Sequence, residues 1–212
     1  GQFDSAIREL EKTIAGDESA IGPRIQLAKL VFSHRKDRQS AHRLLDQVAT
    51  QSPHEPEALR LRTSMLMDEG KNAEAEALLM SAVDAKADFA SLLLRAEFFA
   101  ASGNAQRAEA DYRRLIDLPQ VSPDAFSRFV RFLEDQQRRD EALAMCVRGL
   151  AANPADAGLQ HAQVRMLLDA EDTAQRDRGR ALLKLLRASN PENPEWLRLS
   201  AALAAADGDA GA

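Results

Sequence analysis

The chain has 212 residues, of which 45% are hydrophobic and 29% charged, and its formal net charge is −5. This composition is too apolar for an intrinsically disordered chain, and its mild acidity without a basic block gives no support for nucleic-acid binding. The single cysteine excludes an internal disulfide and a thiolate metal cluster, and no apolar run reaches the roughly 18 residues that span a membrane, so we expect no direct membrane insertion.

Small residues recur through the sequence with a period near 34 residues. The six markers of this repeat lie at intervals of 35, 34, 33, 34 and 37 residues: Ala6, Ala41, Ala75, Ala108, Ala142 and Gly179. A period of this length is typical of stacked helix pairs, each of which contacts mainly its neighbours. We therefore expect an all-α solenoid of about 12 helices in a single domain over residues 1–212.

The expected helices follow in chain order from the first marker. Residues 1–17 form the first of them, and each later marker lies in a comparable helix that starts at a turn. Three of these helices end near a proline 12 residues after the marker: Pro53, Pro154 and Pro191. Proline cannot continue a helix but can begin one, so it marks a join. After the joins we expect further helices at 21–33, 56–69, 89–102, 123–135, 156–170 and 194–207.

The repeat departs from its period at two places. One extra residue falls at 33–39, and about three extra residues fall at 171–176. Because a loop accommodates insertions at little cost in free energy, we expect both of them in loops between helices.

These features together resemble the tetratricopeptide (TPR) repeat family. Residues 193–199, with Trp196, resemble the opening of a TPR repeat, and Gly70 and Gly103 match its turn glycine. The markers match the alanine of the second helix, and the closing prolines match as well. The large apolar position of that helix is filled by Leu45, Leu79, Tyr112, Cys146 and Leu183. Most repeats lack the family's Trp and Tyr, and Arg62 occupies a position that is usually apolar.

The resemblance implies a right-handed superhelix of antiparallel helix pairs, in which first helices line the concave face and second helices the convex one. It places full repeats at 18–53, 54–87, 88–122, 123–154 and 155–191. Residues 1–17 are then the second helix of a truncated repeat, and 192–212 a terminal helix and tail. Because a solenoid needs polar end caps and Gly1 opens on a second helix, we expect further protein upstream.

Residues with reactive side chains do not form a catalytic pattern. The four histidines, His34, His42, His54 and His161, show no spacing that places two on one helix face as metal ligands. Cys146 fills an apolar position and is interpreted as a small buried hydrophobic residue rather than a nucleophile. We therefore predict a protein that is not an enzyme, with no catalytic residues, no metal and no cofactor.

Five phenylalanines cluster on two expected first helices: Phe98, Phe99, Phe126, Phe129 and Phe132. Helical spacing favours packing between repeats. The alternative is that one or two of them, Phe132 foremost, reach the surface and anchor a partner.

The repeat register also predicts which first-helix residues face the concave groove. The candidate partner-binding residues are Lys29, Phe32, Arg60, Met67, Arg128, Arg131, His161, Arg165 and Arg198. Arginine suits forked hydrogen bonds to carboxylates, so an acidic segment is one interpretation of the ligand. The other interpretation is that these charges only keep the surface soluble.

From the resemblance we expect a non-catalytic scaffold that binds a segment of another protein in its concave groove. Two alternatives stay open: a regulatory or targeting segment of a larger enzyme, and a structural subunit of a bacterial envelope or secretion assembly. The sequence leaves the partner and the oligomeric state undetermined. It also leaves the compartment open between the bacterial cytoplasm and the periplasmic side of the envelope.

Overall fold

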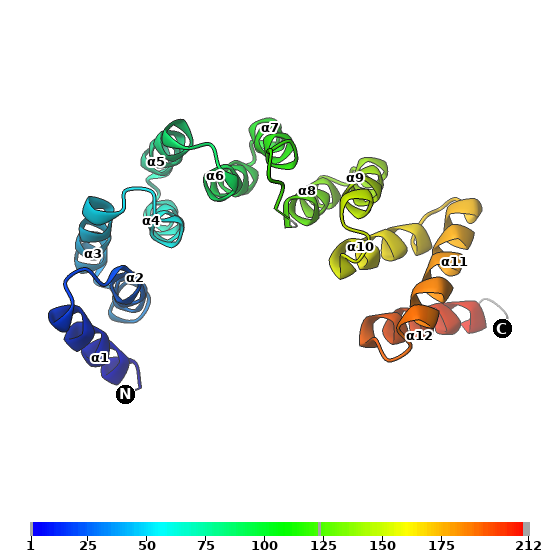
Figure 1. Cartoon of the computed structure of the whole chain (residues 1–212), viewed down its shortest axis with the longest axis horizontal. Coiled ribbons are helices and arrows are strands. Elements are labelled where there is room, and N and C mark those ends of the chain that lie inside the picture. The colour runs from blue at the N-terminus through cyan, green and yellow to red at the C-terminus, as the bar shows by residue number, and fades with distance from the viewer. Residues whose placement is uncertain (1, 123, 210–212) are drawn as a thin grey trace. The chain divides into compact units, whose positions relative to one another are not determined.

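The computed structural model describes the backbone of residues 2–122 and 124–209 (Figure 1). Over these residues it contains twelve α-helices, one π-helical turn and no strand, as the all-α prediction requires. The chain divides into two compact units, Gly1–Leu118 and Pro119–Ala212, called unit one and unit two below. A single domain over all 212 residues stays a prediction.

Unit one contains seven of the helices. They are α1 (Gln2–Gly16), α2 (Ile21–Leu30) with its π-helical continuation η1 (Val31–Arg35), α3 (Arg38–Gln51), α4 (Pro56–Asp68), α5 (Asn72–Ala85), α6 (Phe89–Ala101) and α7 (Ala105–Ile116). Unit two contains α8 (Asp124–Asp135), α9 (Arg139–Ala152), α10 (Ala157–Leu168), α11 (Thr173–Ser189) and α12 (Pro194–Asp209). Each expected full repeat holds one even-numbered first helix and one odd-numbered second helix, and the two pack together.

In four of the five full repeats, the turn between the two helices contains a residue in the left-handed region. Gly70 and Gly103 hold it with φ of 73° and 75°, as their match to the turn glycine indicates. Gln137 (φ 59°) and Lys36 (φ 56°) take the same conformation without being glycine. This conformation costs an L-residue roughly 1–2 kcal/mol, so these two turns are more strained than the glycine turns.

Both insertions lie mainly in helices, so the prediction that they form loops is wrong. The first insertion is absorbed by η1, where the Lys36 N–H donates to the Val31 carbonyl five residues back and so adds a residue without ending the helix. The second lengthens α11, which has 17 residues where α9 has 14. Asp172 accepts hydrogen bonds from the Ala174 and Gln175 N–H groups and starts this extra turn.

The small marker residues lie where paired helices approach most closely. Ala41, Ala75, Ala108 and Ala142 have no exposed surface, and Gly179 is buried. A Cβ on Gly179 would lie 2.9 Å from the backbone nitrogen of Leu168 on α10. Ala6 differs because it is exposed: no described helix covers that side of α1.

A buried ion pair joins the two helices of the third full repeat. The Arg95 guanidinium on α6 donates to both carboxylate oxygens of Asp111 on α7, at 2.8 and 2.7 Å. The two residues are 8% and 2% exposed. The forked geometry satisfies both charges where water cannot, so Arg95 is compatible with a buried position.

The five phenylalanines predicted to pack inside the protein are all buried, Phe132 at 4% exposure. The packing interpretation is confirmed, and the alternative that Phe132 reaches the surface is wrong. The rings of Phe129 and Phe132 stack with centroids 6.3 Å apart, and those of Phe98 and Phe99 meet edge to face at 5.6 Å.

Gly179→Ala should lower the free energy of unfolding by about 1–3 kcal/mol, because the added methyl group meets backbone atoms of α10 that cannot move aside. The matched control is Gly22→Ala in α2, where a Cβ meets nothing within 4 Å. The control should raise the free energy of unfolding by about 0.4–1 kcal/mol. Denaturant unfolding followed by circular dichroism measures both. Equal effects of the two substitutions would contradict the close approach.

Candidate protein-interaction face

First helices of successive repeats touch one another within each unit: α2 contacts α4, α4 contacts α6, and α8 contacts α10. We call the surface carried by α2, η1, α4 and α6 the first-helix face of unit one, and that carried by α8, α10 and α12 the first-helix face of unit two. Every residue predicted to bind a partner lies on one of these helices.

Polar side chains bridge neighbouring first helices in unit one. The Gln26 side chain on α2 donates to Glu57 on α4 at 3.0 Å. One step along, Arg60 on α4 forms an ion pair with Glu97 on α6 at 2.9 Å. Arg60, a predicted partner-binding residue, therefore already holds a carboxylate.

The same kind of bridge occurs in unit two. Arg165 on α10 forms an ion pair with Glu134 on α8. His161, also on α10, lies 3.7 Å from a carboxylate oxygen of Glu195 on α12, and its ring lies 6.2 Å from that of Trp196. Arg198 donates to the other oxygen of Glu195 at 2.8 Å, within α12. Glu195 thus engages two of the predicted residues.

Lys29 and Arg131 are exposed, and their side chains form no ion pair with the described part of the chain. Arg128, one turn before Arg131 on α8, is exposed as well. Lys29 and Arg131 are therefore the predicted cations that an incoming carboxylate could bind without displacing another acid.

The two apolar candidates are only partly accessible. Phe32 lies in η1 and packs against the hydrophobic core of unit one. Met67, near the end of α4, is also half-buried. Each therefore contributes to packing while leaving part of its surface for a ligand.

Positive and negative side chains alternate along the first-helix faces, because three of the predicted arginines there are paired with glutamates. Arg60, Arg165 and Arg198 each hold a glutamate, so the face alternates in charge. Exposed ion pairs of this kind contribute roughly 0–1 kcal/mol, so a partner's carboxylate can exchange with the internal one. The register could have suggested the partners Glu97 and Glu134, which lie among the groove-facing positions. The repeat register did not indicate that Glu57 and Glu195, in the first turns of their helices, would contact residues of the first-helix faces.

The cysteine of the chain does not lie on a first-helix face. Cys146 on α9 is fully buried, as predicted, and burial, with a smaller effect from the charge of Glu134, raises the pKa of its thiol to about 12. In the described ranges, no group of three or more His, Cys, Asp or Glu side chains could hold a metal ion. Over the same ranges, no helix has both the length and the apolar character needed to cross a membrane.

Comparison with known proteins shows similarity in structure alone. The sequence matches no family model and no curated protein. Among solved structures, it is similar to the type IV pilus biogenesis factor PilW (TM-score 0.61, 16% identity, covering 93% of this chain and 90% of PilW). It is also similar to the thermophilic TPR protein TTC0263 from Thermus thermophilus (0.58, 19%, 79% and 92%). A third is YrrB, described as a TPR protein with an unusual peptide-binding site (0.52, 16%, 90% and 97%).

The raised pKa of Cys146 predicts a loss of stability at alkaline pH. The thiol of the unfolded chain ionises near its ordinary pKa of 9.0, whereas the folded protein keeps the proton up to about pH 12. The Cys146 contribution is therefore constant below pH 9 and falls by at most about 1.4 kcal/mol per pH unit above it. Denaturant unfolding of the wild type and Cys146→Ala measures this, because the difference cancels other titrating groups. A difference independent of pH between 9 and 11 would contradict the buried thiol.

Proposed function

Because the chain has the fold of TPR proteins, an all-α solenoid of paired helices, we propose that it is a non-catalytic scaffold that binds a segment of another protein along a first-helix face. The observation that carries this proposal is the row of exposed charged groups on successive first helices, with Lys29 and Arg131 unpaired among the described residues. Side chains at repeating intervals on such a face suit an extended or helical ligand.

The chemistry of the face favours a ligand with carboxylates and apolar side chains. A carboxylate can bind Arg131 or Lys29 directly, and it can reach Arg60 or Arg165 by exchange with the glutamate already there. The exposed parts of Phe32 and Met67 provide apolar contacts in unit one. The glutamates reject a strongly acidic segment, so we propose a ligand in which acids alternate with neutral or basic residues.

A second candidate function is a structural part of a bacterial envelope assembly. The likeness in fold to PilW, a type IV pilus biogenesis factor, favours it. The ligand would then be a segment of another component of that assembly, bound through the same first-helix face. A role as the regulatory segment of a larger enzyme stays a prediction from the sequence.

Arg131→Glu should weaken binding of a peptide ligand by about tenfold, or about 1.4 kcal/mol. The substitution replaces an available cation by an anion, which repels the carboxylate of the ligand. The probe is the set of peptides that wild-type protein selects from a display library of random dodecapeptides, with affinities measured by fluorescence anisotropy. The matched control is Arg178→Glu on the second helix α11, which makes the same charge change at another exposed arginine. It should leave the affinity unchanged.

Both variants should unfold at the same temperature as the wild type, since both side chains are exposed. The affinity should also fall as salt is added. If Arg131→Glu and Arg178→Glu weaken binding equally, the ligand responds to net charge and the first-helix face is not its site.

A further inference from the structure

Arg24 is a buried cation without an acidic partner among the described residues. It lies in α2, is 6% exposed, and forms no ion pair with that part of the chain. Its Nε donates to the side-chain oxygen of Gln47 at 3.3 Å, and one terminal amino group donates to the Ala20 carbonyl at 3.1 Å. The second terminal amino group has no hydrogen-bond partner in these residues. Neutral acceptors therefore satisfy part of the guanidinium, and none compensates its charge.

Arg95, the other buried arginine among the described residues, has the acidic partner that Arg24 lacks. Arg95 is 8% exposed, and its guanidinium donates two hydrogen bonds to the Asp111 carboxylate. Removing a charge from water is costly unless an opposite charge replaces the lost hydration. Hydrogen bonds from Ser19, at 2.6 and 2.8 Å, lower the pKa of the Asp17 carboxyl, and the charge of Arg24 contributes least to this shift. Asp17 forms no ion pair with Arg24. One buried arginine has its acid within the described chain, and Arg24 does not.

The fold itself does not require a cation at this position. Arg24 lies four residues before Ala28, and at successive repeat periods after Ala28 lie Thr63, Ala96, Val130 and Val164. The residues four before these are Leu59, Leu92, Phe126 and Gln160. The first three are buried apolar side chains, and Gln160 is a half-buried polar one. No other full repeat thus has a cation at this position, so a role for the Arg24 charge has to be sought outside the helix pair.

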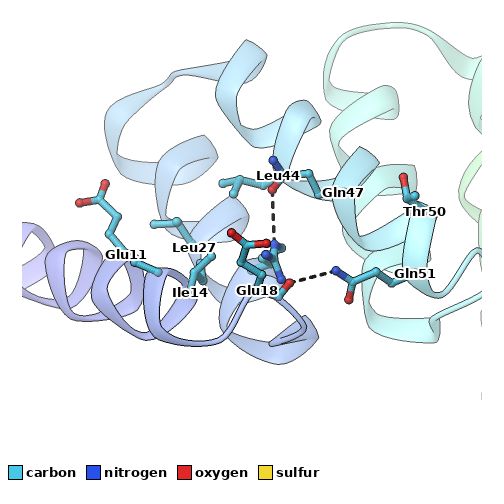
Figure 2. A pocket seen from close by; sticks show the side chains of 10 residues that line it. Glu11, Ile14, Glu18, Leu27, Leu44, Gln47, Thr50 and Gln51 are labelled. Carbon is cyan, nitrogen blue, oxygen red and sulfur yellow. Dashed lines mark hydrogen bonds between the residues drawn. The ribbon is translucent and has the colours of Figure 1, made fainter.

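Arg24 lines a cleft of about 580 Å³ formed by α1, α2 and α3. Figure 2 shows the side chains around it, with dashed lines for the hydrogen bonds that Gln47 and Gln51 make. Three apolar side chains, one from each helix, contribute to its wall: Ile14, Leu27 and Leu44. Gln51 donates to the Glu18 carbonyl at 3.0 Å and ties the end of α3 to the turn between α1 and α2. A volume of this size holds several side chains of a ligand.

The exposed edge of the cleft carries the opposite charge. Glu11 and Glu18 both line it and are exposed. Glu18 forms no ion pair with the described residues, and Glu11 has only Arg35 at 3.9 Å. The cleft is therefore positive at its buried arginine, apolar along its wall and negative at its edge. A ligand that matches all three has a carboxylate flanked by apolar side chains, with a basic residue beside them.

We propose that this cleft, the Arg24 cleft, is a second docking site that takes a short partner segment of that composition. The carboxylate of an Asp or Glu in the segment binds the unsatisfied amino group of Arg24, its apolar neighbours contact Ile14, Leu27 and Leu44, and its basic residue pairs with Glu11 or Glu18. None of the residues predicted to bind a partner on the first-helix faces lines this cleft, so the two sites use different side chains although both include residues of α2. The Arg24 cleft does not depend on those faces being binding surfaces.

The test is a selection of random dodecapeptides on the wild type with counter-selection against Arg24→Leu, which introduces the leucine that two other repeats have at this position. Selected peptides should share one Asp or Glu between apolar residues. Their affinity should fall at least about tenfold on Arg24→Leu, and by a similar factor when the peptide acid is changed to its amide. Combining both changes should cost little more than either alone, since both remove one interaction.

Stability separates docking from a structural role of Arg24. Arg24→Leu should unfold at the wild-type temperature or above, because it removes an uncompensated buried charge. The matched control Arg95→Leu should unfold roughly 10 °C lower, because it leaves the buried Asp111 carboxylate with only the exposed Arg114, at 3.5 Å, as a partner. A similar drop for Arg24→Leu would show that Arg24 is structural and overturn the proposal.

Two further variants locate the bound peptide. Glu18→Lys, on the exposed edge of the cleft, should weaken binding of the selected peptides by repelling their basic residue. Arg131→Glu, on the first-helix face of unit two, should leave their affinity unchanged. If the counter-selection yields no peptide that distinguishes wild type from Arg24→Leu, or if the peptides respond to Arg131→Glu instead, the Arg24 cleft is not a docking site. Binding at the first-helix face is judged by its own variants and is unaffected.

Discussion

The close approach of the two helices in each repeat determines which side chains are buried and which are exposed. Ala41, Ala75, Ala108 and Ala142 have no exposed surface, and at Gly179 even a methyl group has no room. Two helices can pack this closely in only one rotational orientation about their axes, and this orientation fixes which residues remain exposed. The composition of the exposed first-helix faces therefore depends on the packing of the core.

This constraint explains what the sequence could predict. Small residues at a fixed period located the helix pairs, and the register placed Cys146 inside and Arg131 outside. It could not predict the hydrogen bond between Gln26 and Glu57, because the offset between neighbouring first helices depends on packing along their whole length. Nor could it predict the outcome of the insertions, because a loop, a π-turn and a longer helix differ little in free energy.

The two buried arginines show how one residue type can have opposite meanings. Arg95 is paired with the buried Asp111, whose carboxylate also lies 3.5 Å from the exposed Arg114, so the charge of Arg95 is compensated within the chain. Arg24 is buried to the same degree and, within the described chain, is satisfied only by neutral acceptors. From sequence alone both are charged residues within helices. What separates them is whether an acid lies on the facing helix, which only the three-dimensional arrangement shows.

The π-helical turn at Val31–Arg35 breaks the translational symmetry of the array. A residue added inside a helix advances every later side chain around the helix axis, so the last turn of this first helix is out of step with α4 and α6. Phe32 lies in that turn, against the core, whereas its counterpart Met67 lies in a regular helix. A ligand with evenly spaced side chains can thus be in phase with α4 and α6 but not with η1. One inserted residue therefore makes the first repeat of unit one distinguishable from the repeats that follow it in the spacing of its side chains.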